Sequence, residues 1–303
     1  MPWANVGSMI SEGFDGNLSY EQEIGKDMSF MIRANYTWAK NRIEHWEQPV
    51  PKYPYQSWDN TTVGEMRGLV ALGLFKDEND IRNSPKQTFG DYMPGDIKYK
   101  DINADGVIDS DDVVPLGYSS TPRFQYGLAG EFRYKNWNFG IFFEGISDAK
   151  FFYGGAGYVP FINSESGNVL TSVANPKNRW IPMDYAIEHG IDPALAENPN
   201  ARYPRLYYGR SNNNNPVVNG KGIDSTYWIE SARYLRLSSI QIGYGFENHF
   251  LKRIGLERIT VSVIGNNLAV WDNLEYWDAG QASGNGAVYP LQRTFTGQIV
   301  INF

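Results

Sequence analysis

Alternation of apolar and polar residues is the clearest pattern in this chain, and it is strongest in the stretch 293–303. One parity carries large apolar side chains, and the other carries mostly Thr, Gln and Asn, with Val300 as the exception. The apolar positions are Phe295, Ile299, Ile301 and Phe303. A period of two predicts a β-strand with one apolar and one polar face.

Six further segments alternate in the same way, so the sequence predicts seven strands. They cover 17–24, 28–40, 124–134, 137–147, 232–247 and 256–271. In the second, one face is formed by Phe30, Ile32, Ala34, Tyr36 and Trp38. The apolar parity shifts between Leu237 and Ile240, which predicts a β-bulge there.

The connections between these strands alternate strictly in length. Those at 25–27, 135–136 and 248–255 are short, whereas those at 41–120, 148–231 and 272–291 are long. The long ones lack a sustained period and are expected to be ordered loops, with Val63 to Phe75 as a helical turn or plain loop. Short and long connections then lie at opposite ends of an up-and-down sheet, as in outer-membrane barrels. A Greek-key topology does not predict that short and long connections alternate.

The predicted fold class is therefore all-β: a partial antiparallel up-and-down outer-membrane β-barrel of about seven strands with long extracellular loops. Phe303 would lie in the interfacial aromatic girdle on the periplasmic side, which makes the short connections periplasmic and the long ones extracellular. A Cys introduced at Asn213 should then be labelled on whole cells, and one at Asn136 should not. An ordinary closing strand of a soluble sandwich would show the same local pattern as 293–303.

Composition narrows the alternatives. The chain has 303 residues, 42% of them apolar, with no run of about 18 apolar residues that would predict a transmembrane helix. Its 20 Tyr, 16 Phe and 9 Trp suit aromatic girdles or a sugar-binding surface equally well. The net charge of −7 argues against a nucleic-acid partner, and the absence of Cys excludes disulfides and thiolate metal sites. Residues 1–6 do not have the pattern of a signal peptide.

The strongest local motif is an acidic loop at 101–112 that fits the D-x-[DN]-x-[DN]-G pattern of calcium loops. Its predicted metal ligands are Asp101, Asn103, Asp105, the Val107 carbonyl, Asp109 and Asp112. Gly106 permits the sharp turn, and the ion would have a structural role. The twelfth position is Asp112 instead of the usual Glu, whose longer side chain reaches the ion more easily. The alternative is an Asp/Asn-rich turn that binds no ion.

No catalytic residues are predicted, and the chain is not expected to be an enzyme. The three histidines, His45, His189 and His249, are far apart, and no hydrolase, metalloprotease or phosphate-binding motif is present. Three aromatic pairs in the long connections would either stack on sugar rings or form loop cores. They are Tyr207-Tyr208, Tyr227-Trp228 and Tyr276-Trp277.

Several blocks, in order along the chain, resemble the SusC/RagA family of TonB-linked outer-membrane transporters (TonB-dependent receptors). They are Gly95-Asp96-Ile97-Lys98-Tyr99 before the acidic loop, Thr121-Pro122-Arg123-Phe124-Gln125-Tyr126-Gly127, Tyr234-Leu235-Arg236-Leu237, Ile242-Gly243-Tyr244, Gly265-Asn266-Asn267-Leu268, and Tyr289-Pro290-Leu291-Gln292-Arg293-Thr294-Phe295. Asn41-Arg42-Ile43 and Gly73-Leu74-Phe75 also fit.

The resemblance implies an N-terminal plug followed by a barrel of about 22 strands. Residues 1–303 would be the C-terminal part of that barrel, with no counterpart of the plug or signal peptide, and its sheet should be open with two edges. By the same resemblance, the intact protein would lie in the cell outer membrane among lipid. It would import glycan or peptide oligomers with the TonB system and a SusD-like surface lipoprotein.

The competing hypothesis is a soluble all-β carbohydrate-binding module with a structural calcium. The two hypotheses differ in where they place the strand aromatics. A module would bury them between two sheets, whereas a barrel requires one continuous outward face.

Overall fold

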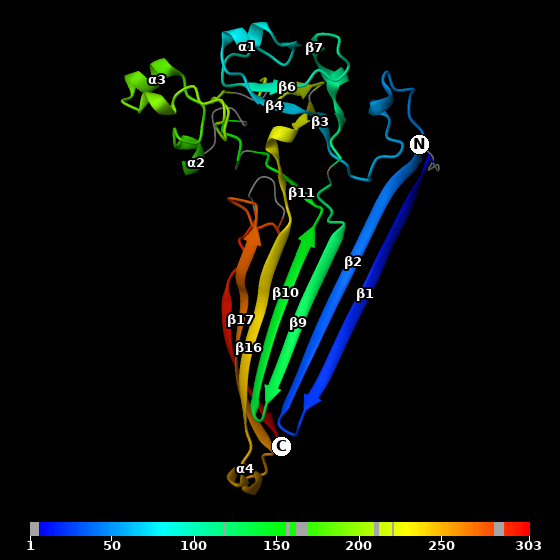
Figure 1. Cartoon of the computed structure of the whole chain (residues 1–303), viewed down its shortest axis with the longest axis vertical. Coiled ribbons are helices and arrows are strands. Elements are labelled where there is room, and N and C mark those ends of the chain that lie inside the picture. Colours follow the sequence, from blue (N-terminus) through cyan, green and yellow to red (C-terminus); the bar gives the residue numbers. More distant parts are fainter. Residues whose placement is uncertain are drawn as a thin grey trace.

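Seven long strands form one antiparallel sheet in the order of the sequence (Figure 1). The computed structural model describes residues 6–117, 119–155, 158–161, 169–208, 212–219, 221–281 and 288–303. The strands are β1 Gly7–Ile24, β2 Met28–Trp46, β9 Phe124–Tyr134, β10 Trp137–Ser147, β16 Tyr234–Phe246, β17 Arg258–Asp272 and β18 Thr294–Asn302. This confirms the predicted all-β class, the number of strands in the main sheet and their up-and-down order.

The register of the ladder places the apolar parities of neighbouring strands on the same face. Phe30 lies opposite Phe132, and Val261 lies opposite Ile299. The pairing of β10 with β16 slips between Phe142 and Phe143, and that of β16 with β17 slips between Leu237 and Ser239. On β16 both slips fall between Leu237 and Ser239, and against β10 the strand has one extra residue there. This confirms the bulge predicted from the parity shift, because the extra residue returns the following apolar side chains to the outer face.

The sheet is open, as expected. Within the ranges that the structure describes, β1 and β18 form its two edges, each paired on one side only. Its short connections meet at one end, lowest in Figure 1, and its long connections lie at the other. The third short connection, between β16 and β17, also contains a helix, α4 (His249–Arg253). No helix in the described part of the chain is both long and apolar enough to cross a membrane.

The long connections are not simple loops. They contain short strands and helices: β3 Arg67–Leu69, β4 Ala71–Leu74, α1 Glu78–Arg82, β5 Lys86–Gln87, β6 Ile97–Tyr99, β7 Val107–Ile108, β8 Val114–Pro115, β11 Lys150–Phe152, α2 Thr171–Ala174, α3 Met183–Glu188, β12 Val217–Val218, β13 Lys221–Gly222, β14 Asp224–Ser225 and β15 Ile229–Ser231. Single 3₁₀ turns occur at Pro54–Gln56, Ser110–Asp112, Pro193–Leu195 and Thr226–Trp228.

The expectation of a helical turn or plain loop between Val63 and Phe75 was wrong, because this segment forms β3 and β4. β4 pairs with β6, and β3 lies between β8 and β14. The β3–β14 ladder is parallel and joins the first long connection to the second. These pairings are between residues distant in sequence, which is why local periodicity did not predict them.

Most of the buried hydrophobic core lies in the connections, and Ile146 of β10 and Tyr234 of β16 pack against it from the sheet. We call the described residues within 47–123, 148–233 and 273–293 the cap; it lies beyond the upper end of the strands in Figure 1. The largest fully buried side chains of its core include Tyr99, Tyr153, Tyr158 and Tyr203. All three long connections contribute to this core, the third through Leu274 and Ala279. The cap is therefore one packed unit.

A buried polar network joins the first two connections inside the cap. The Gln87 side-chain amide donates to the Asn213 side-chain oxygen (2.5 Å), and the Asn213 amide donates to the Ile97 carbonyl (2.8 Å). Asn214 accepts a hydrogen bond from the Ile97 N–H (2.7 Å) and donates to the Asp96 carboxylate (2.8 Å). Asn213 is only 1% exposed. Asn213 is thus an unsuitable labelling position, because its side chain is not accessible to a reagent.

Replacing Asn213 by Ala should loosen the cap and leave the sheet intact. The change removes two buried hydrogen bonds and leaves Gln87 with one amide hydrogen unpaired, although Gln87 still donates to the Ile97 carbonyl. Its cost is about 1–3 kcal/mol. Amide hydrogen exchange of residues 86–99 should accelerate accordingly. Asn79→Ala, at an exposed position of the same connection, is the matched control. Equal exchange in both variants would contradict the structural role of the network.

Candidate functional site: an apolar outer face, a polar inner face and the cap

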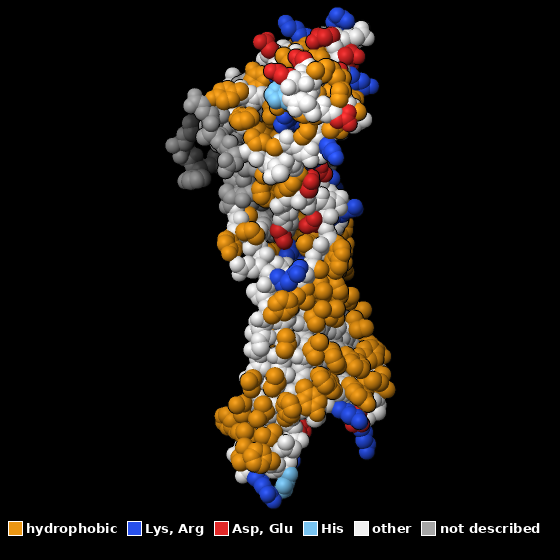
Figure 2. Space-filling model, turned by 90° about the vertical axis from the view of Figure 1, so that its left-hand side faces the viewer, with side chains coloured by type: hydrophobic (Ala, Val, Ile, Leu, Met, Phe, Trp, Pro, Cys, Tyr) orange, Lys and Arg blue, Asp and Glu red, His pale blue; other side chains and the backbone are white. Residues whose placement is uncertain are grey.

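One face of the sheet is apolar and exposed. Phe14 is 62% exposed, Leu18 72%, Phe295 71% and Ile299 67%. Figure 2, seen from the side of β17 and β18, shows hydrophobic side chains gathered over the lower half of the molecule. Most charged side chains lie above this region or at its lower border. A large contiguous patch of this kind marks a surface that water does not normally cover.

The height of the apolar face matches a bilayer. On β2 it runs from Met28 to Trp38, and the next position of the same parity is Lys40, opposite Glu12. Ten residue steps span about 33 Å along a strand at about 3.3 Å per residue. At a strand tilt of about 40° this gives about 25 Å, the height of the apolar band of outer-membrane barrels.

Aromatic rings gather at both borders of the apolar face. Near the short turns, the Trp137 and Tyr244 rings lie 4.9 Å apart and the Tyr244 and Phe246 rings 4.8 Å apart. Toward the cap, the Tyr36 and Phe124 rings lie 6.0 Å apart. Amphipathic rings at these two levels are typical of interfacial girdles.

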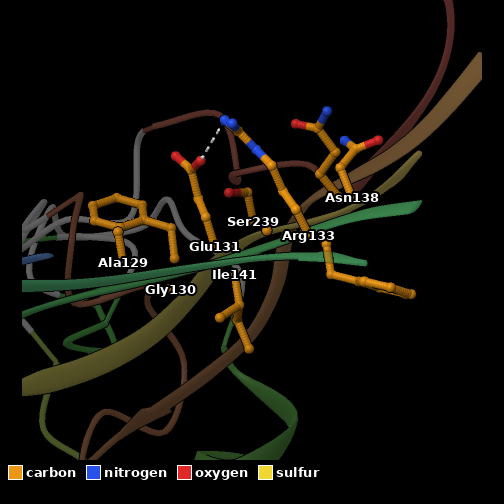
Figure 3. A pocket seen from close by; sticks show the side chains of 11 residues that line it. Ala129, Gly130, Glu131, Arg133, Asn138, Ile141 and Ser239 are labelled. Atoms are coloured by element: carbon orange, nitrogen blue, oxygen red, sulfur yellow. Dashed lines mark ion pairs between the residues drawn. The ribbon is translucent and has the colours of Figure 1, made fainter. Parts of the chain in front are cut away.

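The opposite face of the sheet is polar. A hollow of about 360 Å³ lies along β9, β10 and β16. Figure 3 shows Glu131, Arg133, Asn138 and Ser239 on one side of the sheet and Ile141 on the other. Arg133 and Glu131 form an ion pair of 3.6 Å. This face offers hydrogen-bond donors and acceptors to water or to a polar solute.

Where the polar face meets the cap, a buried arginine forms an ion pair with the third long connection. Arg236 on β16 is 3% exposed. Its guanidinium pairs with Asp278 and donates to the Asn267 side chain, and it lies 3.7 Å from the Glu144 carboxylate. Asp278 also accepts a hydrogen bond from the Gly280 N–H (2.8 Å). No site role was predicted for Arg236; its only sequence signal was membership of the block 234–237.

The predicted calcium loop forms a series of tight turns. Asp101 accepts hydrogen bonds from the Ala104 and Gly106 N–H groups, at 2.7 and 2.9 Å. Asp105 accepts one from the Val107 N–H (2.9 Å). Asn103 accepts one from the Asp105 N–H (3.1 Å), and Asp109 one from the Asp111 N–H (2.7 Å). The donor types suit a hard cation that prefers oxygen.

The twelfth position of the loop points inward. Asp112 is fully buried, and its two carboxylate oxygens accept hydrogen bonds from the Ile102 and Asp109 N–H groups. Burial raises the pKa of the Asp112 carboxyl above its usual value, against these hydrogen bonds. Within the described ranges, no three His, Cys, Asp or Glu side chains are gathered closely enough to hold a metal ion. The six-ligand calcium assignment therefore stays a prediction.

Two of the three aromatic pairs belong at least partly to the cap core. Trp228 is 4% exposed, and the Tyr227 hydroxyl donates to the Arg202 carbonyl (3.1 Å). Tyr276 accepts a hydrogen bond from the Tyr203 hydroxyl (3.1 Å). Tyr208 is 58% exposed and remains available to a ligand. The histidines stay apart, as expected, on β2, after α3 and in α4.

An antiparallel sheet with an apolar outer face, a polar inner face and all long connections at one end defines part of the wall of an outer-membrane β-barrel. In sequence the chain is similar to TonB-dependent receptors of Formosa agariphila. It is 26% identical to receptor P26, covering 99% of this chain and 30% of that protein. It is 22% identical to receptor P3, covering 96% of this chain and 28% of that protein. No family model matches the chain.

Solved structures show the same fold. The RagAB peptide importer in its open-open state superposes with a TM-score of 0.68 at 18% identity, covering 99% of this chain and 29% of that chain. Its closed-closed state gives a TM-score of 0.64 at 18% identity, covering 97% of this chain and 30% of that chain. The predicted likeness to TonB-dependent receptors is confirmed, and the chain has the fold of a barrel portion of such a receptor. It spans about 30% of the length of the curated relatives it matches.

Proposed function

We propose that the chain forms part of the barrel of an outer-membrane, TonB-dependent active transporter. The observation that carries this proposal is the seven-stranded sheet with its exposed apolar band of bilayer height. The relatives named above are receptors and an importer, which supports transport and not catalysis. The polar face would then line the lumen, and the cap would lie at the outer surface.

The proposed cargo is an oligomer of sugars or amino acids, taken up with a SusD-like lipoprotein that covers the cap. The structural neighbour is named a peptide importer, which favours peptides for that protein. For this chain, the polar lumen face and the exposed Tyr208 suit either class, because both peptides and glycans offer hydrogen-bonding groups and stacking surfaces.

A soluble carbohydrate-binding module is the weaker alternative. It would bury the strand aromatics between two sheets. In the structure they lie on one face of a single main sheet, with Phe132, Trp137 and Phe139 each more than one-third exposed. A long-lived monomer in water without detergent would nevertheless favour the module.

Deleting the encoding gene in its host should abolish uptake of one oligomer class. Fluorescently labelled peptide and glycan mixtures are fed separately to deletion and parent cells, and cell-associated signal is measured. Dissipating the proton gradient should reduce uptake in the parent to the level of the deletion strain. Uptake that is unchanged for both mixtures would contradict the transport proposal.

The absence of Cys allows the orientation to be tested at single positions. Lys221 is exposed on the cap and Asn136 lies in the β9–β10 turn, at opposite ends of the molecule. We expect Lys221→Cys to react with a membrane-impermeant maleimide on whole cells, and Asn136→Cys only after permeabilisation. The reverse pattern would overturn the assignment of the long connections to the outside.

We also propose that the 101–112 loop binds Ca²⁺ as a structural ion. Asp101, Asn103, Asp105, the Val107 carbonyl and Asp109 would supply oxygens, and Asp112 would complete the set by giving up its hydrogen bonds to the backbone. The neighbouring segment packs on this loop: Lys52 pairs with Asp111, and the Tyr55 hydroxyl donates to the Asp111 carbonyl (2.7 Å). An ion here would therefore stabilise more of the cap than the loop alone.

Calcium should protect residues 95–120 from proteolysis. Asp101→Ala and Asp105→Ala should each remove most of this protection, because each deletes a charged ligand. Asp91→Ala, exposed in the same connection, should retain it. The proposal fails if cleavage rates with and without Ca²⁺ are the same in the unmodified protein.

A further inference from the structure

The β16–β17 connection differs from the other two short connections. Those at 25–27 and 135–136 are tight turns, whereas residues 247–257 form a small folded unit around α4. Asn248 caps the helix by accepting a hydrogen bond from the Leu251 N–H (2.9 Å). Gly255, with a φ of 80°, ends it, and the Leu256 N–H donates back to the Leu251 carbonyl (3.0 Å).

This unit exposes apolar and basic side chains together. Leu251 is 7% exposed and anchors the helix, whereas Phe250 is 66% and Ile254 55% exposed. Lys252 and Arg253 occupy the last turn of the helix. Two large exposed apolar residues beside two cations are not typical of a turn that faces water. They are typical of an element at a membrane interface, where apolar side chains enter the acyl boundary and cations contact head groups.

The apolar face of the sheet reaches Phe246, the last residue of β16 before this unit. A hollow of about 520 Å³ with an almost wholly apolar lining lies beside Trp137, Tyr244, Phe246 and Val261. Phe246 ends β16, two residues before the capping Asn248. In Figure 2, hydrophobic side chains reach the lower end of the molecule, where Lys, Arg and His side chains border them. Figure 1 places α4 at that end.

The two cations of the unit are less neutralised than the count of charges suggests. Within residues 247–257, Lys252 and Arg253 stand against Glu247 and Glu257, and Arg258 follows as the first residue of β17. Arg258 neutralises Glu247 in an ion pair of 2.8 Å. Lys135 adds a further cation in the β9–β10 turn, where the Asn136 carbonyl accepts a hydrogen bond from the Gly245 N–H of β16 (2.8 Å).

We propose that α4 and the apolar hollow beside it form a binding site for an anionic phospholipid of the leaflet facing the short turns. One acyl chain would occupy the hollow at Trp137 and Phe246. The head-group phosphate would meet Lys252 and Arg253, and Phe250 and Ile254 would enter the interface. This inference rests on the proposed barrel function, since it needs a bilayer around the sheet.

The protein is tested in nanodiscs of phosphatidylcholine with or without phosphatidylglycerol, and the retained phosphatidylglycerol is counted by native mass spectrometry. We expect Lys252→Gln and Arg253→Gln each to weaken its retention about fivefold, as expected for removing one cation near an anionic surface. Lys221→Gln, at the cap, should leave it unchanged. Equal retention in all three variants would overturn the proposal.

A second measurement separates this proposal from the barrel function. Single-Cys variants Phe250→Cys and Val263→Cys carry a bimane label, and quenching by lipids brominated near the head group or deep in the acyl chain is measured. We expect shallow quenching at position 250 and deep quenching at 263. Quenching at 263 alone would overturn the proposed lipid site at α4 and would favour a periplasmic protein as the partner of α4. It would still support the barrel function. No quenching at either position would overturn both proposals.

Discussion

Every other feature of the molecule depends on the continuous backbone ladder between seven neighbouring strands. In hydrocarbon, an unpaired N–H or C=O group costs several kcal/mol, so a chain that presents an apolar surface to lipid must satisfy its backbone within the sheet. The ladder also fixes the register that brings Phe30 beside Phe132 and Val261 beside Ile299. Inside and outside are thus exchanged relative to a soluble protein: the strands expose their apolar side chains, and the cap contains the buried core.

The sheet was predictable because its signal is local. Each strand alternates over about ten residues, and the connections between them alternate in length, so the strand order follows without knowledge of any contact. Even the slip between Leu237 and Ser239 was visible as a change of parity. The resemblance to TonB-dependent receptors rests on short blocks at the same strands and turns, which is why sequence and fold comparisons agree along nearly the whole chain.

The cap was not predictable because its structure depends on distant partners. β3 and β4 have no periodicity of their own and exist through pairing with β14 and β6. The Asn212–Asn215 run has the composition of an exposed loop, yet Asn213 and Asn214 are buried because Gln87, Asp96 and Ile97 satisfy them. For Asp112 the motif specifies an oxygen ligand, but it does not specify whether that oxygen faces an ion or the backbone.

The long reach of the cap contacts has a consequence for the order of folding. Gln87 and Asn213 are 126 residues apart, and the Glu275 N–H that donates to the Tyr153 hydroxyl is 122 residues from it. Closing loops of that length in a free chain costs conformational entropy before any contact forms. The tight hairpins β1–β2 and β9–β10 close at almost no such cost, whereas pairing β2 with β9 and β10 with β16 is what brings the ends of the first two long connections together. We infer that the hairpins form first and that the cap contacts follow the pairing between hairpins.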